Sequence, residues 1–216
     1  MNSSENHTLF CFALKEEAAP FHRLAAGKPE VFTLIVGIGR QNAEKSMRSF
    51  LNSGSPARVF TCGFAGGLNP ALKLGDVVFE GSTLNLQRST RLLAAGAKPA
   101  KFFCADRIAT TIAEKQQLRA QTAADAVEME SAAIHAVCAE KNIPCATVRV
   151  ISDTAHENLP LDFNALAKMD KSLDYGKLFL ALARSPGKIG ALLELRQRTR
   201  FAAERLAAVL QQVVSD

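Results

Sequence analysis

Acidic residues stand at several points of the sequence where an apolar run gives way to a loop or a helical pattern. They are Glu16 and Glu17 after the first apolar run, Glu128 and Glu130 before a helical pattern, and Asp153 at the end of the most apolar run. Two carboxyl groups in unequal environments can divide the roles of proton donor and proton acceptor. The sequence therefore contains candidates for acid–base chemistry.

The environments predicted for these groups differ. Glutamates in the first turn of a helix complement the helix dipole, which explains Glu16 without a function and should keep Glu17 ionised. An acidic residue directly after a buried strand must be capped, paired or exposed to a cleft, because burying it unpaired is costly. Asp153 is therefore less readily explained as structural, and its burial should favour the neutral, proton-donating form.

Two glycine-rich turns follow predicted strands and could let the backbone approach a ligand closely. Their sequences are VGIGRQNA and CGFAGGLNP. Neither has the GxGxxG spacing of a dinucleotide fingerprint or the GxxxxGK[ST] of a phosphate-binding loop. Dinucleotide and nucleoside-triphosphate binding are therefore disfavoured.

The elements that must position these residues alternate between short apolar runs and helical patterns, which is typical of an α/β fold. Strands are predicted at residues 8–14, 31–39, 57–63, 75–86, 100–105, 123–129 and 143–152. Helices are predicted at residues 16–26, 41–52, 109–119, 130–141 and from 161 onward. We therefore expect a doubly wound sheet or a three-layer αβα sandwich with a mixed central sheet.

The run ATVRVIS lacks alternation and is rich in β-branched residues, so it predicts a strand covered on both faces. Ligands bind at the carboxyl ends of such strands. No repeat, low-complexity tract or linker divides the chain. We expect one domain over residues 1–216, with a basic C-terminal helix at about 187–214.

Composition narrows the class of protein. The 216 residues are 48% hydrophobic and 22% charged, the balance of a folded globular chain. The longest apolar run, around residues 31–39, is shorter than the ~20 residues that a membrane-spanning helix needs. The first residues resemble no secretory signal, so a cytoplasmic protein is expected.

The cysteines, histidines and basic residues suggest no metal, disulfide or nucleic acid. Five cysteines without a CxxC pair and four histidines without ligand spacing predict neither a disulfide framework nor a metal site. The formal charge is +5, but residues 184–205 hold six Lys and Arg against two Glu, so the excess is local. With no Trp and one Tyr, nucleic-acid binding is disfavoured. No cofactor is predicted.

Taken in order, the motifs resemble those of the purine nucleoside phosphorylase and nucleosidase family. Within it the chain looks most like the methylthioadenosine/S-adenosylhomocysteine nucleosidases and, more closely, the hopanoid-associated phosphorylases, which are thought to remove adenine from adenosylhopane. The basic C-terminal segment and the short stretch between Val78 and Asp106 carry the closer likeness. The matching segments are FALKEEAAPF (12–21), VGIGRQNAEKS (36–46), TCGFAGGLNPALKLGDVV (61–78), DAVEMESAAIHAVCAEKNIPCATVRVISDTA (125–155) and LARSPGKIGALLELRQRTRFAAERL (182–206).

The resemblance implies a phosphorylase/hydrolase-like fold and roles for the acidic residues. Asp153 in RVISDTA would be the general acid that protonates N7 of the leaving purine. Glu130 in VEMES would hydrogen-bond the ribose hydroxyls, with Met129 packed against the sugar, and Glu17 in LKEEA would activate the attacking water. Further substrate-binding positions implied by the motifs are Gly63, Phe64, Cys104, Ala105, Ile108, Glu128 and Ser152.

The resemblance leaves water and phosphate open as the nucleophile, and the residues favour water. Family phosphorylases have an Arg before a glycine-rich turn and a Ser within it, where this sequence has Thr61 and Phe64. Glu17 would also repel phosphate, since like charges near 4 Å interact by roughly 4 kcal/mol at an intermediate dielectric. Phe64 replaces the Ser usual in nucleosidases, which removes a hydroxyl that could hold Asp153 and makes the pocket more apolar.

The leading hypothesis is an adenine-releasing nucleosidase acting on adenosylhopane or another 5′-modified adenosine. The alternatives are a nucleosidase for small thioethers, a true phosphorylase with phosphate as co-substrate, and an idle nucleoside-binding paralogue. The family likeness also implies a homodimer. Arginines along the C-terminal helix could give weak peripheral contact with a membrane, although docking of that helix onto the core is the simpler reading.

Overall fold

The computed structural model describes residues 7–81, 86–166 and 187–214. Its strands, in chain order, are β1 (Thr8–Phe12), β2 (Val31–Ile35), β3 (Arg58–Gly67), β4 (Val77–Glu80), β5 (Lys98–Pro99), β6 (Phe102–Cys104), β7 (Ala126–Glu128) and β8 (Cys145–Asp153). Its helices are α1 (Lys15–Leu24), α2 (Arg40–Leu51), α3 (Leu86–Ala94), α4 (Ile112–Thr122), α5 (Ser131–Glu140), α6 (Phe163–Leu166) and α8 (Lys188–Val214).

The strands form one mixed sheet. Its main path runs β2-β1-β3-β8-β4-β5, and β7 pairs with both β3 and β6. The strands β2, β1, β3 and β8 are parallel, whereas β4 is antiparallel to β8 and β7 is antiparallel to β3. The predicted α/β class with a mixed central sheet is therefore confirmed.

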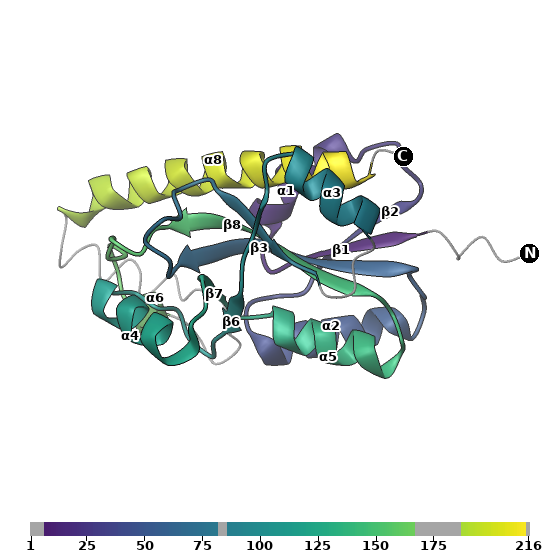
Figure 1. The fold of residues 1–216 in the computed structure, drawn as a ribbon, viewed down its shortest axis with the longest axis horizontal. Coiled ribbons are helices and arrows are strands. Elements are labelled where there is room, and N and C mark those ends of the chain that lie inside the picture. The colour runs from purple at the N-terminus through teal and green to yellow at the C-terminus, as the bar shows by residue number, and fades with distance from the viewer. Residues whose placement is uncertain (1–6, 82–85, 167–186, 215–216) are drawn as a thin grey trace, which may run out of the picture.

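Helices cover both faces of this sheet. Figure 1 shows α1, α3 and α8 on one side and α2 and α5 on the other. Alternating residues of β1 supply the two cores: Phe10 and Phe12 pack with α1 and α8, whereas Leu9 and Cys11 pack with α2 and α5. Period-two alternation of side chains explains this division, which gives the three layers expected.

The strand β8 occupies the middle of the sheet, and all nine of its residues are buried. It lies between β3 and β4 and is covered by α5 on one face of the sheet and by α8 on the other. This agrees with the non-alternating apolar run in the sequence. Parallel neighbours β1, β3 and β8 end at the same edge, where residues 13–14, 64–66 and 152–153 meet.

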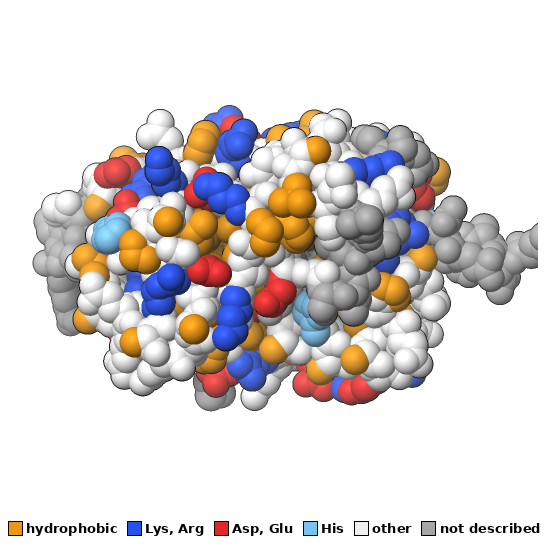
Figure 2. Space-filling model, viewed as in Figure 1, with side chains coloured by type: hydrophobic (Ala, Val, Ile, Leu, Met, Phe, Trp, Pro, Cys, Tyr) orange, Lys and Arg blue, Asp and Glu red, His pale blue; other side chains and the backbone are white. Residues whose placement is uncertain are grey.

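The helix α8 packs along one face of the sheet through small and aliphatic residues. Ala202, Leu206 and Leu210 are fully buried in the same core as Phe10 and Phe60. The basic residues of α8 are distributed around this apolar stripe, and Figure 2 shows Lys and Arg interspersed with Asp and Glu on the face in view. The second half of α8 is therefore an ordinary core-covering helix.

Several predicted boundaries differ from the structure. The strand predicted at 75–86 ends at Glu80, and a helix, α3, begins at Leu86. No helix was predicted here: Leu86 was assigned to the end of the preceding strand, and residues 87–94 were given no element. The helical pattern predicted from 161 onward includes α6, and its residues 167–186 lie outside the described residues. Among the described residues no helix is long and apolar enough to cross a membrane.

Candidate active site

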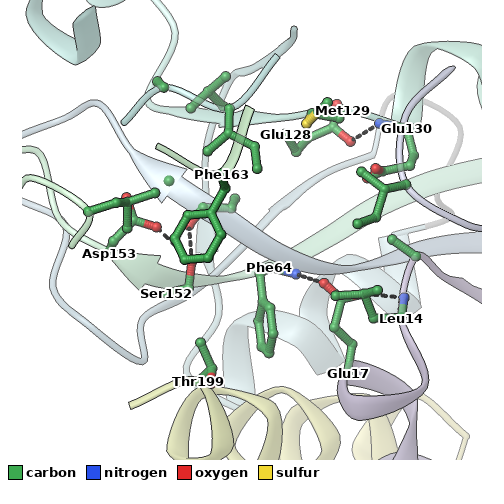
Figure 3. A pocket seen from close by; sticks show the side chains of 18 of the residues that line it. Leu14, Glu17, Phe64, Glu128, Met129, Glu130, Ser152, Asp153, Phe163 and Thr199 are labelled. Atoms are coloured by element: carbon green, nitrogen blue, oxygen red, sulfur yellow. Dashed lines mark hydrogen bonds between the residues drawn. The ribbon is translucent and has the colours of Figure 1, made fainter. Parts of the chain in front are cut away.

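A cavity of about 380 Å³ opens at the edge where β1, β3 and β8 end. Figure 3 shows carboxyl groups from three chain segments around it: Glu17, Glu128 with Glu130, and Asp153. Glu16 also lines the cavity but is solvent-exposed. Much of the remaining wall is apolar and includes Leu14, Ile38, Phe64, Leu159, Phe163 and Leu195.

A fully buried arginine holds one group of carboxylates together. Arg149, in the centre of β8, has Nη2 2.7 Å from Glu128 Oε2 and 3.4 Å from Glu130 Oε2. The same guanidinium donates to the Cys62 carbonyl and to the Thr61 hydroxyl, both at 3.0 Å. These contacts join β8 to β3 and to the turn between β7 and α5, so the cluster belongs to the core of the sheet.

Glycine at position 63 makes room for this cluster. Gly63 has φ +140°, and a Cβ there would lie 2.7 Å from Arg149 Nη1 and 2.9 Å from both carboxylate oxygens of Glu17. The side chains of Arg149 and Glu17 therefore both lie against the backbone of β3 at this glycine. Gly63 contributes by its missing side chain, and it is not among the residues that line the cavity.

Glu17 lies in the first turn of α1, where two backbone amides bind its carboxylate. The N–H groups of Leu14 and Phe64 each donate to it at 3.0 Å. Burial nevertheless raises the pKa of Glu17, with Arg149 and these amides acting in the opposite direction. The expectation that the helix dipole keeps Glu17 readily ionised is thus corrected, because the sequence pattern showed the helix start but not the depth of burial.

The two glutamates before α5 are held differently. Glu128 accepts hydrogen bonds from the backbone N–H groups of Glu130 and Ser131 and from the Ser131 hydroxyl, at 2.9, 2.8 and 2.5 Å. Burial acts to raise its pKa, but Arg149 and these donors outweigh burial and lower the pKa of Glu128. Glu130 accepts one amide hydrogen bond, from Gly39 at 2.8 Å, and burial raises its pKa to about 7, with Arg149 opposing and Glu128 adding to the rise.

Asp153 lies across the cavity at a bulge in β8. Ala65 pairs with Ile151 and Gly66 pairs with Asp153, so Ser152 is the extra residue. Neighbouring side chains of a regular strand point to opposite faces, but a bulge re-aims them, and here Ser152 and Asp153 both line the cavity. The Ser152 hydroxyl donates to Asp153 Oδ1 at 2.8 Å (Figure 3).

The other oxygen of Asp153 faces a second buried cation. Lys115, on α4, is completely buried, and its Nζ lies 2.6 Å from Asp153 Oδ2. The sequence pattern indicates the burial of Asp153 but does not indicate this partner.

The structure brings most of the predicted positions to the cavity. Glu17, Phe64, Ile108, Glu128, Met129, Glu130, Ser152 and Asp153 all line it. Cys104 and Ala105 do not, because β6 pairs with β7 and leaves them buried behind it: the Ala105 N–H donates to the Glu128 carbonyl at 2.7 Å. Of the predicted stretch 104–108, the cavity is lined by Arg107 and Ile108.

Sequence reasoning missed both buried cations. Arg149 had a usable signal, since an arginine in the middle of a strand covered on both faces must find a buried anion. Lys115 had none, because lysine is common in amphipathic helices. Within the described ranges, no group of three or more His, Cys, Asp or Glu side chains is arranged to hold a metal ion.

The fold and the site define the class of this protein. The Phosphorylase superfamily model matches residues 12–94 and 86–181, which together cover most of the chain. The chain therefore belongs to the phosphorylase superfamily. The expectation of an enzyme of this family, a nucleosidase or a nucleoside phosphorylase, is confirmed.

More particular likenesses are to nucleosidases. The chain is 26% identical over 168 residues to a 5′-methylthioadenosine/S-adenosylhomocysteine nucleosidase of Staphylococcus aureus (strain JH9), covering 63% of this chain and 74% of the relative. In fold it is similar to the Neisseria meningitidis 5′-methylthioadenosine/S-adenosylhomocysteine nucleosidase in complex with methylthio-immucillin-A, with TM-score 0.71, 17% identity and 97% and 98% of the two chains covered. Futalosine hydrolase of Helicobacter pylori has TM-score 0.68 and 17% identity over 97% and 99%.

Proposed function

We propose that this protein cleaves the N-glycosidic bond of a 5′-modified adenosine and releases adenine, with water as the nucleophile and adenosylhopane as the first candidate substrate. The observation that carries the proposal is the division of the pocket: Glu17 and Glu130 gather around Arg149, whereas Asp153 has a cation of its own. A glycosidic bond breaks through an oxocarbenium-like state, which needs negative charge near the sugar and a proton for the leaving group.

The arginine cluster suits the sugar end of such a substrate. Its three glutamates outnumber the single arginine, so the cluster favours a cationic sugar. Glu130 would bind the ribose hydroxyls, with Met129 beside the sugar. Glu17, whose pKa burial raises, is a stronger base than an exposed glutamate and would take the proton of the attacking water.

Asp153 would serve the purine end. The bond between C1′ and N9 breaks and its electron pair stays with the purine, while N7 gains the proton of Asp153. The water oxygen bonds to C1′, and its proton passes to Glu17. Free ribosyl product and adenine result. Glu17 then releases the proton to solvent and Asp153 takes one up, which restores the starting protonation states.

Phosphate is disfavoured as the nucleophile because the cations near the cavity are engaged. Arg149 already contacts Glu128, Thr61 and the Cys62 carbonyl. Arg40, the other candidate phosphate ligand, pairs with Asp106 at 3.2 Å and hydrogen-bonds the Cys104 carbonyl. A phosphate dianion would also face the glutamate cluster, so water is the better-matched nucleophile.

An apolar 5′ group fits the rest of the wall. Phe64 of β3, Leu195 of α8 and Leu159 from the connection between β8 and α6 offer the cavity no hydrogen-bonding side chain. A hydrocarbon substituent gains about 25 cal/mol for each Å² of apolar surface that it buries there. Phe64, which replaces the serine usual in nucleosidases, thereby favours a hydrophobic 5′ substituent over a small polar one.

Product analysis tests this proposal. Adenosylhopane and methylthioadenosine are each incubated with the purified protein, with and without phosphate, and the products are separated by chromatography. We expect adenine and a free ribosyl product in both buffers, with adenosylhopane the better substrate. Turnover that requires phosphate and yields a ribose 1-phosphate would show that water is not the nucleophile.

The second candidate is a nucleosidase for methylthioadenosine or S-adenosylhomocysteine, which the likeness to the Staphylococcus aureus relative favours. In that case methylthioadenosine has the higher kcat/KM. The absence of adenine release from every substrate, together with measurable nucleoside binding, identifies an idle binding protein instead.

We also propose a homodimer and weak membrane contact through the first half of α8. Leu193 is 62% exposed there and Arg196 is exposed beside it. Basic residues near an anionic surface contribute on the order of 1 kcal/mol each. Cosedimentation should be greater with anionic than with neutral vesicles and should fall with added salt. Equal, negligible binding to both kinds of vesicle at low salt would reject membrane contact. The homodimer is tested separately, by measuring the molar mass of the protein in solution by analytical ultracentrifugation.

A further inference from the structure

We propose that Lys115 is a positioning residue that holds the carboxyl group of Asp153 in place for proton transfer. The inference rests on the proposed function, because that function makes Asp153 the proton donor. It starts from Phe64, which supplies no hydroxyl to orient the aspartate. The two oxygens of Asp153 are instead held by Ser152 and Lys115, at 2.8 and 2.6 Å.

The ammonium group of Lys115 is fixed in three directions. Its Nζ donates to the Thr154 carbonyl at 2.7 Å and to the Glu157 carbonyl at 2.9 Å, besides contacting Asp153 Oδ2. An ammonium group has three N–H donors, and three oxygens surround this one. The lysine therefore has no freedom to move away from Asp153 without losing a buried hydrogen bond.

The start of α4 orients this lysine. Thr111 caps the helix by accepting from the Glu114 N–H, and Glu114 accepts in return from the Thr111 N–H, both at 3.2 Å. Glu114 also pairs with Arg107 at the surface. Glu114 thus binds the helix N-terminus at the surface. The next residue, Lys115, points to the buried side of α4, next to the turn that follows β8.

Burying a charged lysine costs free energy, so a purely structural role must explain why a lysine stands at this position. Two carbonyls would be enough to attach α4 to the turn at 154–157. The third bond goes to the one carboxylate across the cavity from the glutamate cluster. A cation there also stabilises the carboxylate that remains once the proton has passed to N7, and so favours the transfer.

The first test is Lys115→Met, which keeps an unbranched side chain and removes the charge. We expect kcat for adenine release to fall about 10- to 100-fold, the effect of a misplaced catalytic group, with KM changed less than threefold. Lys98→Met is the matched control, because Lys98 pairs with Asp76 at 2.7 Å on the surface, outside the cavity lining. Its kcat should match that of the unaltered protein.

A double-mutant cycle separates positioning from general structural support. In an Asp153→Asn background, Lys115→Met should cause little further loss of kcat, because the group that it positions is already inactive. The same fold loss in both backgrounds would overturn the proposal. If Lys115→Met does not fold, as judged by circular dichroism, Lys115→Gln is used, since its amide can still donate to the carbonyls of the turn.

A crystal structure of the folded Lys115 variant gives a readout without activity. The Asp153 carboxylate should move from its present position while α4 and the turn at 154–157 stay in place. An unmoved carboxylate would overturn the proposal. If the unaltered protein releases adenine from neither nucleoside, the proposed function fails, and the position of this carboxylate alone decides the role of Lys115.

Discussion

Arg149 and Lys115 are both buried cations beside the same pocket, but they differ in the number of carboxylates around them. Arg149 lies near Glu17, Glu128 and Glu130, whereas Lys115 pairs, among the carboxylates of the described residues, with Asp153 alone. Burial raises the pKa values of Glu17 and Glu130, and repulsion from Glu128 and Glu17 adds to the rise at Glu130, whose pKa reaches about 7. Arg149 and its hydrogen-bond donors keep the pKa of Glu128 low. The arginine cluster is therefore short of positive charge, while the lysine pair is balanced.

The difference teaches how one pocket can contain two kinds of carboxyl chemistry. A cluster short of positive charge favours a cation or holds a proton, which suits an oxocarbenium-like sugar. A balanced pair fixes the direction of one carboxyl group, which suits proton transfer to a defined atom. Five substitutions and one control variant test this contrast.

The largest expected effect is on the balanced pair. Asp153→Asn cannot donate the proton, so kcat for adenine release should fall about 10²- to 10⁴-fold with the fold intact. Steady-state kinetics and circular dichroism measure the two quantities. Near-normal turnover would remove Asp153 from the mechanism and reduce the contrast to a structural one.

The next largest effect is on the arginine cluster. Arg149→Met leaves three buried glutamates without their cation and should lower the free energy of unfolding by about 3–5 kcal/mol, as urea denaturation at pH 7 would show. The control is Arg198→Met, which breaks a partly exposed pair with Glu157 and should cost about 0–1 kcal/mol. A similar loss in both variants would mean that the cluster does not depend on its arginine.

Glu130→Gln tests the proton held by the cluster. The pKa of Glu130 is raised to about 7, so its stabilising contribution is complete below its ordinary pKa of 4.5 and is lost as the pH rises through 7. Between these values each such group lowers the free energy of unfolding by about 1.4 kcal/mol per pH unit. Urea denaturation from pH 5 to 7.5 should therefore show a shallower decline in Glu130→Gln than in the unaltered protein.

The difference between the two pH dependences of stability reports on Glu130, because the other titrating groups are common to both proteins. His135, whose pKa burial lowers, changes stability in the opposite direction over part of the same range, but it is present in both proteins. Equal slopes in the two proteins would mean that Glu130 is already ionised at pH 5. Glu130→Gln should also reduce kcat more than it raises KM, because its hydrogen bonds to ribose would strengthen as charge develops.

The smallest expected effects come from a matched pair of serines. Ser152 donates to Asp153, which otherwise contacts Lys115, whereas Ser131 donates to Glu128, which keeps two backbone amides and Arg149. Ser152→Ala should therefore lower kcat about tenfold, and Ser131→Ala should mainly cost about 1 kcal/mol of stability. Kinetics and urea denaturation of both variants decide this, and the reverse ranking in kcat would contradict the proposed division of roles.

The sequence predicted the fold class and placed acidic residues near strand ends, although several strand boundaries differ, because α/β alternation and strand-end carboxylates are local patterns. Asp153 and Glu130 could be found in this way. Arg149 could have been found as well, because it stands in the middle of a strand covered on both faces. Lys115 could not, since a single sequence shows that it lies in a helix but not which carboxylate it meets. The bulge at Ser152 was also hidden, because it depends on how β8 pairs with β3.

The electrostatic environment of Glu17 likewise depends on contacts between distant segments. The helix start at Glu17 was readable, but its burial under Arg149 depends on Gly63 bringing β3 close to both side chains. Likewise, Cys104 and Ala105 lie at the right place in the sequence, yet pairing of β6 with β7 turns them away from the cavity. Such features are set by pairing between distant segments, which local patterns do not encode.

The position of β8 has a consequence for biosynthesis. Among the described residues it is the last strand along the sequence, but it lies between β3 and β4, in the middle of the sheet. On a translating ribosome, β3 and β4 emerge long before the strand that joins them, so their facing edges wait unpaired until residue 153 has been made. Because Arg149 and Asp153 are both part of that strand, the nascent chain gains its central pairing, the cation of its glutamate cluster and its proposed proton donor in one step.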